Sequence, residues 1–362
     1  MKTSPTIDDG DAYAFNIVPL ADVQGAHIVE LLSSNLSSVG ATTKSVAFWR
    51  WKHAINPFGE SLGCAALSKI NGELVGIRPL MKWAFQSKEG NLIHALRPVD
   101  TVTHQNWQGK GLFKTLTIFC IIQLADDPTT LVFNTPNQNS LPGYEKMGWI
   151  RTAQLSIFVR VGNPAHFAVS GIHWLLSHIK PRGHGVAQEL KELDQGLDDT
   201  AVEEIIGFCT AAESKRIPAG TRTVRSKEYL AWRYFQQPNI HYGFHISRNN
   251  LGCIESIVIY RMEYRGLAEL LLIVDIFVKE SDSNLVRAGI RSLIRGTKAH
   301  FYIAHAADAT LELKAIKKEM FFKAKEKVLA ARIVGRAPSK QQPNEELSQM
   351  SWDLTFSDIE IF

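Results

Sequence analysis

Residues 99–114 read Val99-Asp100-Thr101-Val102-Thr103-His104-Gln105-Asn106-Trp107-Gln108-Gly109-Lys110-Gly111-Leu112-Phe113-Lys114, and this stretch is the most informative in the chain. A strand pattern runs directly into a loop with two glycines, and the loop opens an apolar helix pattern. The first N–H groups of a helix have no partner within it, and the helix dipole places positive charge there. Gly109 and Gly111 let the main chain approach a ligand closely, and Lys110 adds charge. The stretch therefore predicts a binding site for a phosphate or pyrophosphate group.

Two other phosphate-binding loops do not match these residues. A P-loop requires GxxxxGK followed by Ser or Thr, which Gly109-Lys110-Gly111 does not supply. A dinucleotide-binding fingerprint requires GxGxxG, and its third glycine position holds Lys114. Both loop types are therefore excluded.

The residues around this loop predict a mixed α/β sheet. Residues 17–36 and 48–52 have helical patterns, and three strand-like runs follow at 64–70, 74–85 and 92–103. After the loop come a helix at 112–124, a buried strand at 130–134, a short helix at 141–147 and a last strand at 152–161. This order, αα-βββ-α-β-α-β, is typical of an α/β (α+β mixed sheet) fold with helices on the faces of the sheet.

Two motifs resemble the GNAT superfamily of N-acetyltransferases. Gln108-Gly109-Lys110-Gly111-Leu112-Phe113 resembles the family's motif A, Gln/Arg-x-x-Gly-x-Gly/Ala, although Phe113 replaces a small residue. Residues 134–149 resemble the second cofactor segment, which commonly ends in Tyr-x-x-x-Gly-Phe and here ends in Tyr144-Glu145-Lys146-Met147-Gly148-Trp149. The resemblance covers residues 60–160, and it is closest in character to GNAT-like proteins of surface-polysaccharide biosynthesis.

The resemblance implies a cofactor, acetyl-CoA or another acyl-CoA, and assigns residues to it. In the family, two central strands part and the pantetheine arm pairs with the exposed main chain like an added strand. Carried over, Val102 and His104 would offer backbone groups to pantetheine. The residues that would hold the pyrophosphate are Gln108, Gly109, Lys110, Gly111, Leu112 and Phe113. Asn134 and Asn139 would bind the cofactor arm or cap the following helix, and no metal is implied.

The resemblance also suggests catalytic residues. Tyr144 matches the family's general acid, and a phenol can give its proton to a departing thiolate. Asp100 is predicted as a general base or substrate anchor because it lies on the strand that leads into the cofactor loop; His94 and His104 are alternatives. The structural alternatives are a Tyr144 that only packs on the sheet and an Asp100 that only pairs with Arg97.

Three stretches of the first half recur in the second half in the same order. They are Phe48-Trp49-Arg50-Trp51 and Ala231-Trp232-Arg233-Tyr234, Pro98-Val99-Asp100-Thr101 and Ile273-Val274-Asp275-Ile276, and Lys146-Met147-Gly148-Trp149 and Lys318-Glu319-Met320-Phe321. The repetition predicts two tandem GNAT-like domains. We place the catalytic, acyl-CoA-binding domain at residues 1–161, a linker at 162–185 and a second domain at 186–362.

The second domain is expected to be degenerate. No Gln-x-x-Gly-x-Gly follows Asp275, and Ile316 stands in the place of Tyr144. We therefore expect one active site, with the C-terminal half shaping an acceptor pocket between the halves.

The expected activity is direct transfer of an acetyl group from acetyl-CoA to a small-molecule acceptor. The acceptor carries an amine or hydroxyl, and an amino sugar or nucleotide sugar would suit the resemblance. Two alternatives stay open: a non-catalytic sensor of CoA or a nucleotide, and an aminoacyl-tRNA-dependent peptidyl transferase of related architecture. Catalytic transfer is distinguished from sensing by turnover.

The composition of the chain predicts its cellular location and argues against several kinds of partner. The net charge of the 362 residues is +4, too small to predict nucleic-acid binding. The cysteines Cys64, Cys120, Cys209 and Cys253 form no CxxC pair, which argues against a zinc site and suggests reduced thiols and a cytoplasmic protein. No apolar run is long enough to span a membrane, and the N-terminus lacks a signal-peptide pattern. The apolar run at 167–179 is interpreted as an interdomain helix, with weak contact to a membrane surface as the alternative.

Overall fold

The computed structural model describes residues 14–35, 45–125, 130–162, 197–265, 268–335 and 343–359. The elements of the N-terminal half are β1 (Phe15–Pro19), η1 (Leu20–Asp22), α1 (Gly25–Asn35), α2 (Val46–His53), β2 (Leu62–Ser68), β3 (Leu74–Gln86), β4 (Leu92–Pro98), β5 (Val102–Thr103), η3 (Gln105–Trp107), α3 (Leu112–Gln123), β6 (Thr130–Asn134), α4 (Leu141–Lys146) and β7 (Ile150–Val161). The elements of the C-terminal half are α6 (Asp199–Ser214), β8 (Arg222–Thr223), α7 (Lys227–Tyr234), β9 (Gly243–Arg248), β10 (Ile254–Arg265), β11 (Ala268–Val278), α8 (Ser283–Gly296), β12 (Phe301–His305), α9 (Leu311–Lys318), β13 (Phe322–Val334), α10 (Pro343–Gln349) and α11 (Phe356–Ile359).

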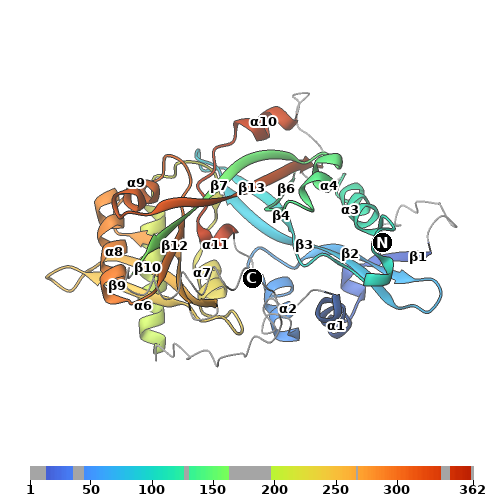
Figure 1. Cartoon of the computed structure of the whole chain (residues 1–362), viewed down its shortest axis with the longest axis horizontal. Coiled ribbons are helices and arrows are strands. Elements are labelled where there is room, and N and C mark those ends of the chain that lie inside the picture. Colours follow the sequence, from blue (N-terminus) through green and yellow to red (C-terminus); the bar gives the residue numbers. More distant parts are fainter. Residues whose placement is uncertain are drawn as a thin grey trace.

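These strands form one continuous mixed sheet across the molecule (Figure 1). Its order is β1-β2-β3-β4-β6-β13-β7-β12-β11-β10-β9, and β5 and β8 pair with β3 off this path. Two adjacent pairs are parallel, β4 with β6 and β11 with β12, and the other pairs are antiparallel. The predicted mixed α/β sheet with tandem halves is confirmed.

The two halves exchange their last strands at the centre of the sheet. β13 of the C-terminal half lies between β6 and β7, and pairs with β6 over Ala330–Val334. In return, β7 of the N-terminal half pairs with β12, joining Val161 to Phe301 and Ile157 to His305. Figure 1 shows β7 and β13 side by side across the middle. Each half therefore completes its sheet with a strand from the other. The predicted domain boundaries at residues 161 and 186 stay predictions, and residues 163–185 of the predicted linker, with the run at 167–179, lie outside the described residues.

A pair of tryptophans marks an approximate two-fold relation between the halves. The rings of Trp51 and Trp232 stack with centroids 4.6 Å apart. Each indole N–H donates to the backbone oxygen of the other residue, both at 2.9 Å. Such reciprocity is what two-fold symmetry imposes on a contact. The side chains of Ser45 and Ser226 cap α2 and α7 in the same way. The duplication is thus supported, but the predicted alignment of Trp49 with Trp232 was wrong by two residues, since Trp51 is the counterpart.

Two predicted elements differ from the structure. The predicted helix at 17–36 is strand β1, a short turn and then α1, because the branched residues Ile17 and Val18 pair with β2. The predicted strand at 92–103 is divided into β4 and β5. Pro98 lies opposite Leu80, and Val102 lies opposite Ile77, so β4–β5 contains one more residue than β3 across this interval. This β-bulge holds Asp100 at φ 48°, in the left-handed region.

The core is divided between the sheet faces. One cluster lies under α3 and α4 of the N-terminal half, and its counterpart lies under α8 and α9. The largest cluster joins the halves through α2 and α7, where Trp51, Tyr229 and Trp232 pack with residues of both halves. Burial of these aromatic side chains contributes much of the hydrophobic stabilisation of the contact between the halves.

Candidate active site

The loop before α3 presents a row of unused backbone donors. Among the described residues, no acceptor is hydrogen-bonded to the N–H groups of Gly109 through Lys114. Gly109 and Gly111 have φ values of 74° and 79°, and a Cβ at either position would meet nothing within 4 Å. Helix α3 begins at Leu112, and its N-cap Gly111 makes no side-chain cap. The loop is therefore open, and six donors lie at the positive end of a helix dipole.

Two parallel strands separate close to this loop. The ladder between β4 and β6 contains only the pairs Ala95–Leu131 and Leu96–Val132, although both strands continue beyond it. At the end of β6, the side-chain oxygen of Asn134 is buried and lacks a hydrogen bond. The guanidinium of Arg97 connects Thr135 to the carbonyl oxygens of Asp358 and Ile359 in α11. The gap between β4 and β6 thus contains an unsatisfied acceptor and is bordered by the C-terminal helix.

The main-chain groups of β5 alternate in direction. His104 donates its backbone N–H to Val75 of β3 at 2.9 Å, so this group is already used by the sheet. Val102 faces β3 as well, because residues two apart on a strand point their N–H and C=O groups to the same side. Thr103 faces the opposite side, where its carbonyl accepts from the Gln108 side chain at 3.2 Å. Thr103 therefore offers the outward-facing groups, and the pairing of Val102 and His104 with pantetheine stays a prediction.

Tyr144 is buried in a cluster of aromatic and cationic side chains. Its ring contacts Phe113 and Trp149 edge-on, with centroid distances of 5.5 and 5.3 Å. Its hydroxyl oxygen accepts a hydrogen bond from Arg78 of β3 at 3.0 Å. The guanidinium of Arg78 lies over the rings of both Phe113 and Tyr144. Tyr144 and the cofactor loop are therefore adjacent, joined by Phe113, the residue that departs from the family pattern.

Asp100 lies on the other face of the sheet, at the bulge. Its Oδ2 atom contacts Lys52 Nζ at 2.7 Å and His53 Nε2 at 2.9 Å, and His53 Nδ1 contacts Ser61 Oγ at 2.9 Å. Burial alone would raise the pKa of Asp100, but Lys52 and His53 hold it well below its usual range. Burial lowers the pKa of both Lys52 and His53. A carboxylate this acidic is a weak base, so its surroundings favour an anchoring role. The alternative partner Arg97 is not its neighbour; Lys52 is.

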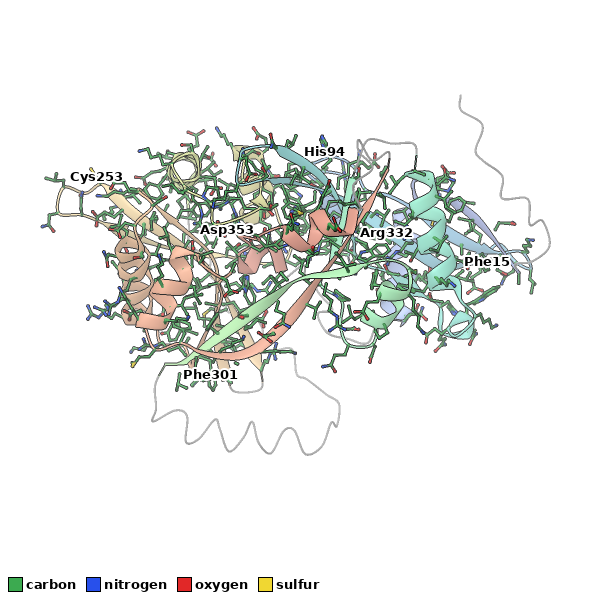
Figure 2. The ribbon with its side chains drawn as sticks, turned by 90° about the horizontal axis from the view of Figure 1, so that it is seen from above. Phe15, His94, Cys253, Phe301, Arg332 and Asp353 are labelled. Carbon is green, nitrogen blue, oxygen red and sulfur yellow. The ribbon has the colours of Figure 1, made fainter. Side chains whose placement is uncertain are left out.

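The other predicted residues fall in different places. His94 is exposed on β4 and is labelled in Figure 2. His104 accepts from the N–H of Asn106 and caps a short turn. Asn139 is exposed, and it is the side chain of Asn137 that accepts from the N–H groups of Asn139 and Ser140. Lys110 places its amine 5.2 Å from the centroid of Trp107.

Sequence reasoning missed the residues that surround these groups. They are Lys52, His53, Ser61, Arg78 and Thr101. Lys52, His53 and Arg78 are charged or titratable side chains buried at the sheet. The available signal was the pair Lys52-His53 at the end of the aromatic-rich helix α2, and a lone arginine inside the mostly apolar strand β3. Buried ionisable groups of this kind gather at functional sites more often than elsewhere.

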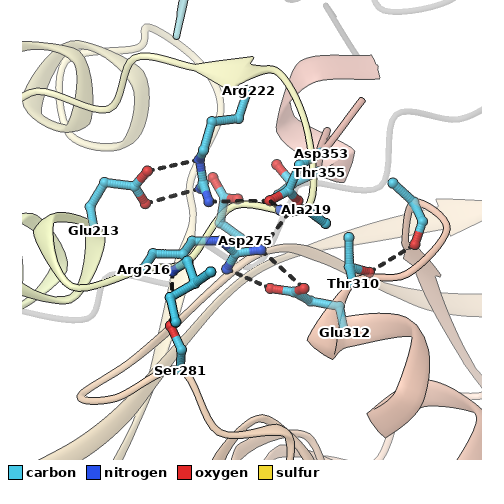
Figure 3. A network of polar contacts seen from close by, with 12 residues as sticks. Glu213, Arg216, Ala219, Arg222, Asp275, Ser281, Thr310, Glu312, Asp353 and Thr355 are labelled. Atoms are coloured by element: carbon cyan, nitrogen blue, oxygen red, sulfur yellow. Dashed lines mark hydrogen bonds and ion pairs between the residues drawn. The ribbon is translucent and has the colours of Figure 1, made fainter. Parts of the chain in front are cut away.

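The equivalent region of the C-terminal half is filled. Arg216 binds Glu312 at 2.7 Å and Asp353 at 3.3 Å, and Arg222 binds Glu213 at 2.8 Å (Figure 3). A hollow of about 350 Å³ lies along α8, but its lining consists only of side chains of that helix, so it is space between exposed arginines. Within the described ranges, no group of three or more His, Cys, Asp or Glu could hold a metal ion, and no helix is long and apolar enough to cross a membrane.

Comparison with known proteins identifies the fold. No family model and no curated protein matches the sequence. Saccharomyces cerevisiae N-myristoyltransferase, crystallised with bound myristoyl-CoA, aligns with a TM-score of 0.55 at 10% identity, covering 92% of this chain and 84% of that one. A conserved Enterococcus faecalis V583 protein, called a probable N-acyltransferase, aligns with a TM-score of 0.58 at 13% identity, covering 89% of this chain and 73% of that one. This chain has the fold of N-myristoyltransferase.

The shared fold accounts for the arrangement described above. The N-acyltransferase fold covers nearly the whole chain, so both halves and the exchanged strands are part of one architecture. At 10–13% identity the likeness concerns the fold, and the chemistry must be argued from this chain's own residues.

Proposed function

We propose that this chain is an acyl-CoA-dependent N-acyltransferase that moves an acetyl group from acetyl-CoA directly to an amine. One observation carries the proposal: six N–H groups, from Gly109 to Lys114 at the start of α3, have no acceptor among the described residues, and a Cβ at Gly109 or Gly111 would meet no atom within 4 Å. An anion with several oxygens complements them, and the diphosphate of CoA is such an anion. A neighbour of the same fold was crystallised with myristoyl-CoA, which supports this class of cofactor.

The parted strands suggest the path of the pantetheine arm. Beyond Leu96 and Val132, β4 and β6 no longer pair, and Thr103 faces outward beside the loop. An extended chain with amide groups can pair there as an added strand does. The unbonded side-chain oxygen of Asn134 offers an acceptor for one of its N–H groups. This path runs from the α3 loop toward the gap at the end of β6.

Tyr144 then serves as the acid of the proposed reaction. The amine nitrogen attacks the thioester carbonyl, the C–N bond forms and the C–S bond breaks. The thiolate takes the phenol proton, and the proton lost by the amine restores the phenol through solvent, so the reaction is balanced. Among the described residues, Tyr144 accepts from Arg78 but donates to none, so its own proton is available.

Asp100 is proposed as the anchor of the acceptor. Its Oδ2 is occupied by Lys52 and His53, whereas its Oδ1 has no partner among the described residues, and 25% of its side chain is exposed. An ionised carboxylate at the bulge between β4 and β5 attracts an ammonium group before transfer. We propose an amino sugar or nucleotide sugar as the acceptor. The reaction would then belong to the assembly of a surface polysaccharide in the cytoplasm. An acceptor that carries a hydroxyl in place of the amine is a second form of the same proposal.

Native mass spectrometry with CoA tests cofactor binding. We expect one CoA molecule per chain, because the α8 helix lacks the open glycine loop. Absence of any complex at millimolar CoA would refute both the enzyme and a CoA sensor. Thiol release from acetyl-CoA over a panel of amino sugars then separates the two: steady release that depends on the acceptor requires turnover, whereas binding without release identifies a sensor. Transfer of the aminoacyl group from aminoacyl-tRNA to an amine, with release of free tRNA and no CoA, would instead support the peptidyl-transferase alternative.

A further inference from the structure

Arg78 is an unusual residue at the centre of the proposed site. Its side chain is 0% exposed, on β3 beneath α3 and α4. Its Nη1 donates to Thr101 Oγ1 at 2.7 Å and to Tyr144 Oη at 3.0 Å. Its Nε and Nη2 atoms are buried without a hydrogen bond.

No carboxylate of the described residues forms an ion pair with Arg78. Its surroundings supply two hydroxyl oxygens and two aromatic faces, Phe113 at 5.0 Å and Tyr144 at 5.2 Å from the guanidinium carbon to the ring centroids. Cation–π contacts of this kind offset only part of the cost of removing a guanidinium from water. An apolar side chain of similar volume would fill the space without that cost. A buried guanidinium without a carboxylate partner is therefore better explained by an anion that forms during function.

The geometry at Tyr144 identifies that anion. A guanidinium carries donors only, so Arg78 must donate to the phenol oxygen. The phenol hydrogen is therefore directed away from Arg78. When the phenol gives up its proton, the negative charge forms on the oxygen that Arg78 already contacts. The Phe113 ring shields this contact on the side of the cofactor loop.

We propose that Arg78 is the positioning residue that makes Tyr144 an effective acid. This inference rests on the proposed function. Arg78 orients the phenol hydrogen toward the sulfur of CoA and stabilises the phenolate left after the C–S bond breaks and the S–H bond forms. Phe113 holds the guanidinium in place, which explains why a bulky residue stands where the family pattern has a small one.

The experiment combines Arg78 and Tyr144 variants. Thiol release at saturating acetyl-CoA is measured for wild type, Arg78→Met, Arg78→Lys, Tyr144→Phe and the double variant Arg78→Met/Tyr144→Phe. Isothermal titration gives the Kd for CoA of each, and circular dichroism confirms folding. Arg332→Met is the matched control, because Arg332 also lies over a ring, that of Trp149 at 5.7 Å, without touching the phenol.

We expect Arg78→Met to lower kcat about 10- to 100-fold while the Kd for CoA changes less than about three-fold, since a charge-assisted hydrogen bond contributes about this factor. In the Tyr144→Phe background the same substitution should change kcat less than about three-fold, because the phenolate no longer forms. Arg78→Lys should recover part of the rate, and Arg332→Met should leave it unchanged. If Arg78→Met does not fold, Arg78→Lys and its cycle with Tyr144→Phe decide the question.

The outcomes separate this inference from the proposed function. A wild type that releases no thiol refutes the proposed function and this inference together. An active wild type in which the Arg78 and Tyr144 losses multiply, or in which Arg78→Met only weakens CoA binding, refutes the inference and leaves the acyltransferase in place.

Discussion

Helices α3 and α8 hold equivalent positions in the two halves, and their first turns differ in one decisive way. Before α3, Gly109 and Gly111 leave six N–H groups open. Before α8, the carboxylate of Asp282 accepts from the N–H of Asn284 at 2.8 Å and caps the helix. A negative charge at this position satisfies the helix dipole from within and repels a phosphate. The same framework therefore has unused N–H donors before the helix in one half and a capped helix end in the other.

The parallel strands beside these two helices also differ between the halves. β4 and β6 pair at two positions, whereas β11 and β12 pair at four, from Leu270–Phe301 to Ile273–Ala304. Beyond that ladder, the C-terminal half contains the network of Arg216, Glu312 and Asp353 (Figure 3). These ion pairs fill the C-terminal half at this place, whereas buried polar atoms without a hydrogen bond occur in both halves.

The largest expected effect tests whether the halves are related by two-fold symmetry. Trp51→Ala and Trp232→Ala should each lower the free energy of unfolding by about 3–5 kcal/mol, because each removes one ring of the stack and leaves the backbone carbonyl of the other tryptophan without its indole donor. Urea unfolding measures both. Trp49→Ala, at the partner position predicted from sequence, should cost clearly less. A loss below about 1 kcal/mol in one of the pair would show that the contact is not reciprocal.

The two equivalent aspartates should differ in their contribution to stability. Asp275 is only 2% exposed and contacts Arg225 at 3.1 Å, Ser357 and Tyr234. Asp275→Asn should therefore lower the free energy of unfolding by about 3–5 kcal/mol, since it removes one of the two buried carboxylates, Asp275 and Asp358, that compensate the charge of Arg225. Asp100 is 25% exposed, so water can compensate part of the charge of the buried Lys52, and Asp100→Asn should cost less, about 2 kcal/mol. Equal losses in urea unfolding would contradict the assignment of a structural role to one and a functional role to the other.

The ends of β6 and β12 provide a pH-dependent comparison. Asn134 is equivalent to His305, whose pKa burial lowers to about 4. An unfolded histidine binds a proton near pH 6.5, so stability is full above that pH and falls as the pH drops toward 4. Between pH 7 and pH 4 the wild type should lose about 3 kcal/mol more of its free energy of unfolding than His305→Asn does. Other histidines are present in both proteins and cancel in this difference. Parallel pH profiles would show that His305 is not buried in its neutral form.

Local patterns in the sequence were enough to predict the loop before α3 and most of the helices and strands. The glycines at 109 and 111 and the helix that follows depend on neighbouring residues, so their structure could be predicted. The exchange of β7 and β13 could not, because both strands have ordinary patterns and only tertiary contacts choose their partners. The alignment of the repeats failed because α2 contains two tryptophans. The spacing from Pro57 to Pro238 equals that from Trp51 to Trp232, and it would have resolved the choice.

The candidate site was predictable only where its residues are consecutive. Tyr144 and Asp100 were chosen from their positions in motifs, but their partners come from other elements: Arg78 from β3, and Lys52 and His53 from α2. No pattern in a single sequence indicates that a lysine at a helix end will be buried against an aspartate 48 positions later. Partners of this kind depend on how the helix packs on the sheet.

The substitution Gly111→Asp places before α3 the negative charge that Asp282 places before α8. Gly111→Asp should weaken CoA binding roughly 100-fold, because a carboxylate would occupy the place of a phosphate oxygen and repel the rest. Gly111→Asn has the same shape and tolerates the left-handed backbone, so its smaller loss measures the steric part. Gly252→Asp is the matched control, since Gly252 has φ 80° and open surroundings in a turn of the C-terminal half. Isothermal titration with CoA measures all three. Equal losses for Gly111→Asp and Gly111→Asn would mean that charge does not govern the site.

The smallest effect is expected when the negative charge before α8 is removed. Asp282→Ala removes the cap of a 14-residue helix and should lower the free energy of unfolding by about 1 kcal/mol in urea. It should leave the CoA stoichiometry at one per chain, because Lys279, Glu280 and Ser281 precede the helix where α3 has glycines, and their Cβ atoms keep a phosphate from the main chain. A second bound CoA in Asp282→Ala would show that one carboxylate, and not the loss of glycines, keeps the C-terminal half from binding. The two halves would then differ by a single charge, and the second site would be closed only electrostatically.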